Sequence, residues 1–176
     1  SENNLWAGSV RGGIFGIKET YIKTYKDVAL NNTNGLSEKA IISLHEDEDS
    51  ILWIGTDGGG INRYNPFTGK FRHYPSTYGD KVASITSLSR SELLVSLYSK
   101  EVFIFNKKTG EYKPFTILDH DTNIEECYSG YMPLTHKVAE DKIYILSQSA
   151  LIYNPVTRQF SSLKMNEKEI DPGALN

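Results

Sequence analysis

Short apolar runs recur along the chain, and short polar segments rich in glycine, asparagine and proline separate them. Over residues 40–75 the runs read AIISLHE, ILWIGT, GINRYN and KFRHYP. They alternate between apolar and polar positions or are wholly apolar, and none shows the 3.6-residue period of an amphipathic helix. Short runs of this kind, bounded by turn residues, are typical of β-strands. The pattern therefore predicts an all-β chain.

The chain also aligns with itself. An offset of 41 residues places segment 64–71 on segment 105–112 without a gap, and an offset of 48 places the latter on segment 153–160. Near the start, an offset of 47 superposes residues 5–9 on residues 52–56. Four copies of one unit are therefore visible, and the first copy is truncated.

Four strands in a unit of 41 to 48 residues are the organisation of a β-propeller blade. Because blades stack face to face, both sides of each sheet are covered, which explains why residues 51–54 are continuously apolar. We expect an open arc of just under four blades of four antiparallel strands, that is, a partial propeller. The expected blades are 1–30 (truncated), 36–78, 79–118 and 130–165, with an insertion loop at 119–129 and a tail at 166–176.

Several positions recur at the blade period. The aromatic ones are expected to pack between sheets, at Tyr64, Phe105 and Tyr153 and at Phe71, Tyr112 and Phe160. An asparagine that can bond its own backbone two residues on begins one turn in each of the last three copies, at Asn65, Asn106 and Asn154. Gly69 and Gly110 close two of these turns and tolerate a positive φ. Arg158 stands at that position in the last copy, so its turn is expected to differ.

Composition excludes several classes of protein. Of 176 residues, 39% are hydrophobic and 23% are charged, which is typical of a folded soluble domain. The net charge of -3 offers no basic surface for nucleic acid or for an anionic membrane. Cys127 is the only cysteine, so no internal disulfide can form. No apolar run is long enough to span a bilayer, so we expect no membrane contact by this segment.

Residues 58–60 are three consecutive glycines, which invites comparison with a phosphate-binding loop. Such a loop needs a following helix, whose N-terminal N–H groups hold the phosphate. The residues that follow, INRYNPF, are strand-like and run into a proline. The glycines also match neither of the two common nucleotide-binding glycine motifs. We therefore expect a hairpin turn here, and no cofactor.

Other candidate sites are incomplete. Asp119 begins the D-x-D-x-N spacing of a calcium loop, but Ile124 stands where such a loop needs glycine, and Gly130 where it needs glutamate. A looser cation site within residues 119–126 and a solvated insertion loop both stay open. The acidic run 46–49 is expected to be a solvated turn rather than a paired-carboxylate site. No histidine, serine or cysteine stands in a catalytic motif, so no catalytic or metal-binding residue is predicted.

The strand order assigns loops to the two faces of the arc. In an antiparallel blade, the loop between the second and third strands emerges on the same face as the connection to the next blade. Arg11, Asp57 and Tyr98 lie in such loops, and the long connections 31–38 and 119–130 share their face. Binding residues concentrate on loops held by a rigid scaffold. We therefore expect a ligand to contact Arg11, Asp57 and Tyr98.

Residues 35–74, GLSEKAIISLHEDEDSILWIGTDGGGINRYNPFTGKFRHY, resemble the two-component regulator propeller repeat. The Gly-Leu-Ser lead, the Leu-Trp-Ile-Gly-Thr strand, the double glycine before Ile-Asn-Arg-Tyr-Asn-Pro and the closing aromatic stand in order. Residues 5–14 are similar, whereas the last two copies keep the spacing and lose the Trp-x-Gly-Thr core. The resemblance implies the periplasmic sensor region of a bacterial hybrid two-component system, which binds carbohydrate fragments and signals to a histidine kinase, usually as a dimer.

We therefore expect a non-catalytic ligand-sensing module whose ligand is an oligosaccharide. An open arc leaves a strand edge uncovered, so we also expect self-association or contact with the remaining blades of a larger propeller. Two alternatives stay open. A propeller enzyme acting on polysaccharide, of sialidase or lyase type, needs Arg, Tyr and acidic residues at the central channel, and the inner strands 40–46 and 82–88 offer almost none. A protein-interaction scaffold of WD-repeat type needs Gly-His and Trp-Asp pairs, and the chain has neither.

Overall fold

The computed structural model describes residues 5–10, 12–18, 21–25, 34–75, 81–98, 102–115, 133–146 and 150–162. Within these residues the chain forms fifteen β-strands and no helix, so none of them forms a helical membrane span. The first sheet holds β1 (Leu5–Ser9), β2 (Gly13–Lys18) and β3 (Tyr21–Tyr25). The second holds β4 (Ile41–Glu46), β5 (Leu52–Thr56), β6 (Ile61–Asn65) and β7 (Lys70–Tyr74). The third holds β8 (Val82–Ser87), β9 (Glu92–Leu97), β10 (Val102–Asn106) and β11 (Tyr112–Pro114), and the fourth holds β12 (Leu134–Ala139), β13 (Lys142–Leu146), β14 (Ala150–Asn154) and β15 (Gln159–Ser162).

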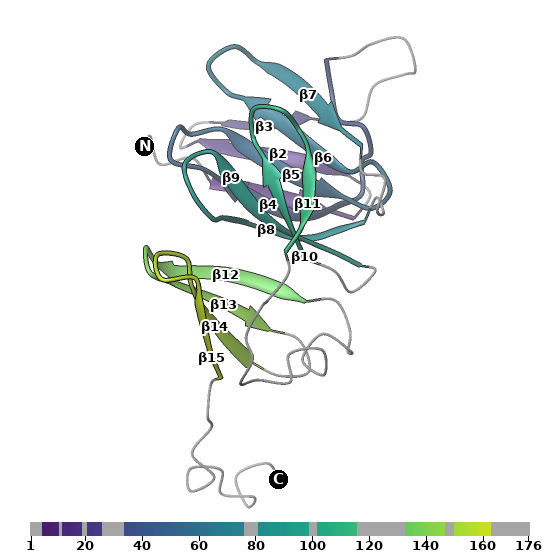
Figure 1. Ribbon diagram of the computed structural model, residues 1–176. Coiled ribbons are helices and arrows are strands. Elements are labelled where there is room, and N and C mark those ends of the chain that lie inside the picture. The colour runs from purple at the N-terminus through teal and green to yellow at the C-terminus, as the bar shows by residue number, and fades with distance from the viewer. Residues whose placement is uncertain are drawn as a thin grey trace, which may run out of the picture.

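Each sheet is an antiparallel meander in which the spatial order of the strands follows the sequence. The sheets follow one another along an unclosed arc, and the fourth sheet, coloured light green to yellow, lies at the end away from the N-terminus (Figure 1). One three-stranded sheet and three four-stranded sheets make just under four blades. The prediction of an all-β partial propeller with antiparallel blades is confirmed.

Hydroxyl groups join the innermost strands of neighbouring blades. Ser43 and Ser84 occupy equivalent positions beside irregularities in the pairing of β4 and β8. Ser43 Oγ donates to the Val82 carbonyl at 3.0 Å, and Ser84 Oγ lies 2.9 Å from Thr135 Oγ1 in β12. Thr135 N also donates to Ser84 Oγ at 3.0 Å, and Thr86 Oγ1 donates to the Thr135 carbonyl at 2.9 Å. These bonds hold β4, β8 and β12 side by side and satisfy polar groups that would be costly to bury unpaired.

A stack of aromatic side chains lies at each blade interface. The first stack is Trp6, Tyr25, Tyr64 and Phe71. The second is Trp53, Tyr74, Phe105 and Tyr112, and the third is Phe115, Tyr153 and Phe160. Ring centroids of the contacting pairs in the second stack are 5.0 to 6.0 Å apart, within the range that aromatic pairs prefer. The interpretation of the recurring aromatics as packing between sheets is confirmed.

The three asparagine turns share one geometry. The side-chain oxygen of each asparagine accepts bonds from the backbone N–H groups two and three residues on, at Asn65, Asn106 and Asn154. The closing residue has a φ of 67° at Gly69, 81° at Gly110 and 59° at Arg158. The expectation that the last turn differs is therefore wrong. The asparagine bonds hold the backbone in the left-handed region although arginine lacks the freedom of glycine.

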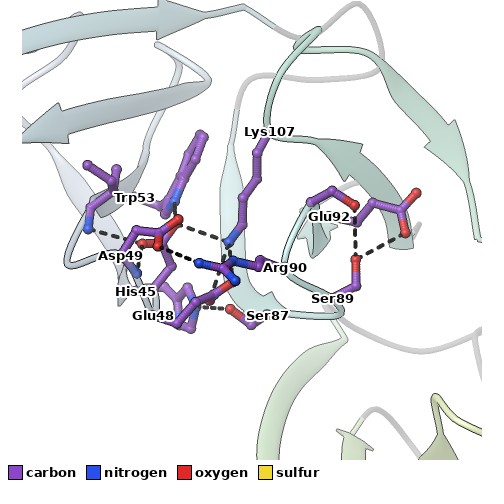
Figure 2. Close-up of polar contacts among 12 residues, drawn as sticks. His45, Glu48, Asp49, Trp53, Ser87, Ser89, Arg90, Glu92 and Lys107 are labelled. Atoms are coloured by element: carbon purple, nitrogen blue, oxygen red, sulfur yellow. Dashed lines mark hydrogen bonds and ion pairs between the residues drawn. The ribbon is translucent and has the colours of Figure 1, made fainter.

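Asp47 joins the second and third blades. Its side chain is 3% exposed and accepts bonds from Trp53 Nε1 at 2.8 Å and from Ile51 N at 3.0 Å. Lys107 Nζ, from the turn between β10 and β11, lies 3.0 Å from Asp47 Oδ2, and Figure 2 shows this lysine reaching toward Trp53 and the acidic turn. We call Asp47, Trp53 and Lys107 the clasp. The expectation that the acidic run 46–49 is only solvated is wrong for Asp47, because the side chain is buried and blade stacking brings the Lys107 ammonium to it.

Candidate functional site

The three glycines form the turn between β5 and β6, as predicted. Thr56 N and Thr56 Oγ1 donate to the Gly60 carbonyl at 3.2 and 2.9 Å, and Gly59 N donates to Thr56 Oγ1 at 3.0 Å. Gly58 and Gly60 have φ values of 110° and 69°. A Cβ on Gly60 would also lie 2.5 Å from the Tyr74 carbonyl oxygen. The glycines therefore serve backbone geometry, and the strand that follows leaves no helix N-terminus for a phosphate.

Asp57, the residue before these glycines, contacts Lys81 of the third blade, and Lys81 in turn contacts Tyr98. Its Oδ1 lies 2.9 Å from the Nζ of Lys81, which comes just before β8. The ring of Tyr98, just after β9, has its centroid 5.5 Å from the same ammonium, and Tyr98 N donates to the Lys81 carbonyl at 3.0 Å. The structure thus brings the predicted residues Asp57 and Tyr98 together through Lys81. We call these three residues the face cluster.

The face cluster is open to solvent. The side chains of Asp57 and Lys81 are 40% and 53% exposed, and Tyr98 is 57% exposed. The hydrogen bond and the charge of Asp57 raise the pKa of Lys81, so the ammonium stays charged at neutral pH. An ion pair this exposed adds little to the free energy of unfolding. The cluster presents an aromatic face beside one hydrogen-bond acceptor group and one donor group, and their charges cancel.

A buried asparagine holds the connection between the first and second blades against the glycine turn, beside the face cluster. Asn62 in β6 is fully buried. Ser37 N donates to Asn62 Oδ1, and Asn62 Nδ2 donates to Ser37 Oγ, both at 2.8 Å. Ser37 Oγ donates in turn to the Gly59 carbonyl at 2.8 Å, and Leu36 packs into the core. The Gly-Leu-Ser and Ile-Asn elements of the repeat therefore tie the connection between blades to the glycine turn.

Sequence reasoning missed Lys81 and Asn62. Lys81 belongs to no motif, and only the stacking of one blade on the next brings it to the turn of the preceding blade. Asn62 did carry a signal, since a polar side chain at a strand position that faces a neighbouring sheet needs a hydrogen-bond partner. Arg11 and the candidate cation segment 119–126 lie outside the described residues.

The inner strands β4, β8 and β12 line a hollow of ≈ 430 Å³. Beside it, His45 Nε2 lies 2.8 Å from Ser87 Oγ, and burial lowers the pKa of His45, which keeps the imidazole neutral at pH 7. Within the described residues, no carboxylate accepts a bond from the other ring nitrogen of His45, so this pair lacks the orienting acid of a catalytic triad. The described residues also contain no group of three or more His, Cys, Asp or Glu placed to hold a metal.

Comparisons with solved structures agree with the observed fold. The extracellular domain assigned to a hybrid two-component system of B. thetaiotaomicron superposes with a TM-score of 0.68 at 17% identity. A second such domain from the same organism has a TM-score of 0.65 at 23% identity. Both matches cover 93% of this chain, but only 23% and 24% of the other chains. The chain therefore spans about a quarter of the length of these domains.

Virginiamycin B lyase from Staphylococcus aureus is also similar, with a TM-score of 0.68 and 19% identity over 96% of this chain and 54% of the lyase. At such identities the likeness shows the fold alone. Comparison with curated protein sequences gave no match. The family model described as two component regulator propeller matches residues 35–58, the segment that holds Ser37, Asp57 and the start of the glycine turn. Residues 35–58 thus match the model of the two component regulator propeller, within a chain that folds as a partial β-propeller.

Proposed function

We propose that this chain is a non-catalytic ligand-sensing module in the periplasmic part of a two-component receptor, and that it recognises carbohydrate. The family match and the fold shared with extracellular domains of two-component systems support the receptor role. The main support for ligand binding is the face cluster, in which an exposed tyrosine lies beside an ion pair.

The chemistry of the face cluster suits a neutral sugar. A sugar ring has an apolar C–H face that packs on an aromatic side chain, and its hydroxyls both donate and accept hydrogen bonds. Tyr98 offers the ring, the Asp57 carboxylate accepts from hydroxyls, and the Lys81 ammonium donates to them. Because Asp57 and Lys81 neutralise each other, the cluster favours neither an anion nor a cation.

The position of the face cluster also suits a sensor. Asp57 belongs to the second blade, whereas Lys81 and Tyr98 belong to the third. A ligand that contacts all three residues stabilises one relative position of the two blades, and binding energy that differs between two positions shifts their populations. In this proposal the parent receptor works as a dimer and carries the histidine kinase that reads the shift.

Neutral oligosaccharides test the proposal. The 176-residue chain is screened by thermal shift, and affinities are measured by calorimetry. We expect at least one oligosaccharide to raise the melting temperature without release of new reducing ends. Tyr98→Ala should weaken its binding about tenfold, because an aromatic contact at the centre of a site is worth more than about 1 kcal/mol.

Phe67→Ala is the matched control, since Phe67 is a 77% exposed aromatic in a turn on the opposite face and its loss should leave affinity unchanged. Equal binding by the wild type and Tyr98→Ala would contradict the site. Cleavage of a polysaccharide that His45→Ala abolishes would instead support the alternative of a propeller enzyme.

A further inference from the structure

The second and third blade interfaces use equivalent positions but fill them differently. At the second interface the clasp closes the space between the blades, and its Trp53 is 1% exposed (Figure 2). The repeat offsets place Leu94, Leu88 and Pro155 at the three clasp positions of the third interface. Two leucines and a proline occupy less volume than an indole with an ion pair, and they provide no charge to close the interface.

A groove of ≈ 780 Å³ lies at this place, between Leu88 and the start of β9 at Glu92 on one side and the turn that carries Pro155 and Arg158 on the other. Its volume is within the range of about 300–1,000 Å³ that small-ligand sites occupy. The turns that border it emerge on the side of the arc opposite the face cluster. We call it the third-interface groove.

Three aromatic rings line the third-interface groove. Tyr153 is 6% exposed, and its ring centroid lies 5.1 Å from that of Phe115 and 4.6 Å from that of Phe160, both half-buried. Burial raises the pKa of the Tyr153 hydroxyl, and although the charge of Arg158 lowers it and that of Glu92 raises it, the net shift is upward. The phenol therefore stays protonated and keeps its capacity to donate.

The charged lining of the groove is mainly positive. Lys113 and Arg158 line it, and within the described residues neither is paired with a carboxylate. Among the described residues that line the groove, Glu92 is the one carboxylate, and it accepts a long bond of 3.4 Å from Ser89 Oγ. Arg158 has a φ of 59°, in the region that the equivalent turns fill with glycine. The last turn therefore has a positively charged side chain at a strained backbone position. A strained residue beside a groove is a reason to look for function there.

We propose that the third-interface groove binds an acidic saccharide, that is, one that carries a carboxylate or a sulfate. The sugar ring packs on the half-buried rings of Phe115 and Phe160, and the acid group binds Arg158 and Lys113. A guanidinium matches the paired oxygens of these anions in bidentate geometry. Charge complementarity separates this ligand from the neutral sugar of the face cluster. The two proposals share the carbohydrate class but rest on different residues.

The test uses the nitrogen-15-labelled 176-residue chain and three probes: galacturonic acid trisaccharide, its methyl ester, and a chondroitin sulfate disaccharide. Calorimetry gives the affinity, and amide chemical shifts locate the bound probe. Arg158→Gly removes the cation and installs the residue that the equivalent turns use, so the turn is kept. Leu88→Trp places an indole at a residue that lines the groove. Lys108→Ala removes an exposed cation from the equivalent turn of the third blade and is the control.

We expect an acidic probe to bind and to shift the amides around Phe115 and Arg158, and the methyl ester to bind at least about tenfold more weakly. Arg158→Gly should weaken binding about tenfold, Leu88→Trp should abolish it, and Lys108→Ala should leave it unchanged. Binding of neither acidic probe, equal binding of acid and ester, or wild-type affinity in Arg158→Gly would each overturn the proposal.

The face-cluster proposal and the groove proposal can be tested independently of each other. Tyr98→Ala should weaken the binding of a neutral oligosaccharide but leave the acidic probe in the groove at wild-type affinity. A neutral sugar bound at the face cluster, with no acidic probe in the groove, would overturn the groove proposal alone. An acidic probe bound in the groove, with no neutral sugar bound at Tyr98, would overturn the face-cluster site alone.

Discussion

Arg158 adopts a backbone conformation that two other blades give to glycine, with a φ of 59°. The left-handed region costs a non-glycine residue roughly 1–2 kcal/mol, and the bonds to Asn154 hold the arginine there. Glycine avoids that cost but loses about 0.5–1 kcal/mol of its own through the greater freedom of the unfolded chain. The arginine therefore keeps a positive charge at the third-interface groove at a small net cost in stability.

Arg158→Gly should raise the free energy of unfolding by about 0.5 kcal/mol, because relief of the left-handed strain outweighs the added entropy of the unfolded chain. Urea unfolding measures the change. Gly69→Ala is the matched control: its φ is 67° and a Cβ there meets nothing within 4 Å, so it should lower the free energy of unfolding by about 1 kcal/mol through conformation alone. Destabilisation by Arg158→Gly would show that the arginine contributes contacts that outweigh its strain.

At the scale of the blade, the clasp shows what stacking adds to a turn. Burial acts to raise the pKa of Asp47, but the bonds from Trp53, Lys107 and Ile51 outweigh it and hold the pKa below its ordinary value. A carboxyl with a lowered folded-state pKa contributes stability above its unfolded value of about 3.9. That contribution disappears as the pH falls through the folded-state value. The join between the second and third blades should therefore weaken in acid.

Asp47→Asn should lower the free energy of unfolding by about 2 kcal/mol at pH 7, because the Lys107 ammonium, which is only 11% exposed, then keeps only the Glu48 carboxylate, at 3.5 Å. It should also remove part of the loss of stability that the wild type shows between about pH 5 and pH 3. Denaturant unfolding at a series of pH values measures both effects. Asp141→Asn, in an exposed turn, is the control and should follow the wild type. A curve for Asp47→Asn parallel to the wild type in acid would contradict the role of this carboxyl.

The elements could be predicted from sequence because their signals are local. The alternation of AIISLHE and GINRYN and the asparagine turns depend on neighbouring residues, and the structure forms β4, β6 and those turns where expected. The site could be predicted only in part. Asp57 and Tyr98 were accessible through strand order, whereas Lys81 joins them through stacking of blades that no local pattern records.

At the scale of the whole molecule, the arc is unclosed and its last sheet presents apolar side chains to solvent. Leu134, Val138 and Leu146 of β12 and β13 are 44%, 46% and 43% exposed. Exposed apolar positions clustered on one sheet, together with unpaired strand edges, favour association.

The isolated chain should therefore self-associate. Light scattering over a concentration series should give a mass that rises above that of the monomer. Val138→Lys, at the exposed end, should reduce the association because it places a charge in the contact, whereas Val156→Lys, in an exposed turn, should not. A monomeric mass at the highest concentration would contradict this expectation.

The proposed sensing role requires that the arc binds a neutral sugar at the face cluster and does not cleave it. Its most direct test is a titration of the nitrogen-15-labelled chain with the best neutral oligosaccharide of the thermal-shift screen, followed by amide chemical shifts and by analysis of the recovered sugar. We expect saturable shifts centred on Asp57, Lys81 and Tyr98, with the oligosaccharide recovered intact. Shifts confined to other parts of the chain, or a cleaved oligosaccharide, would contradict it.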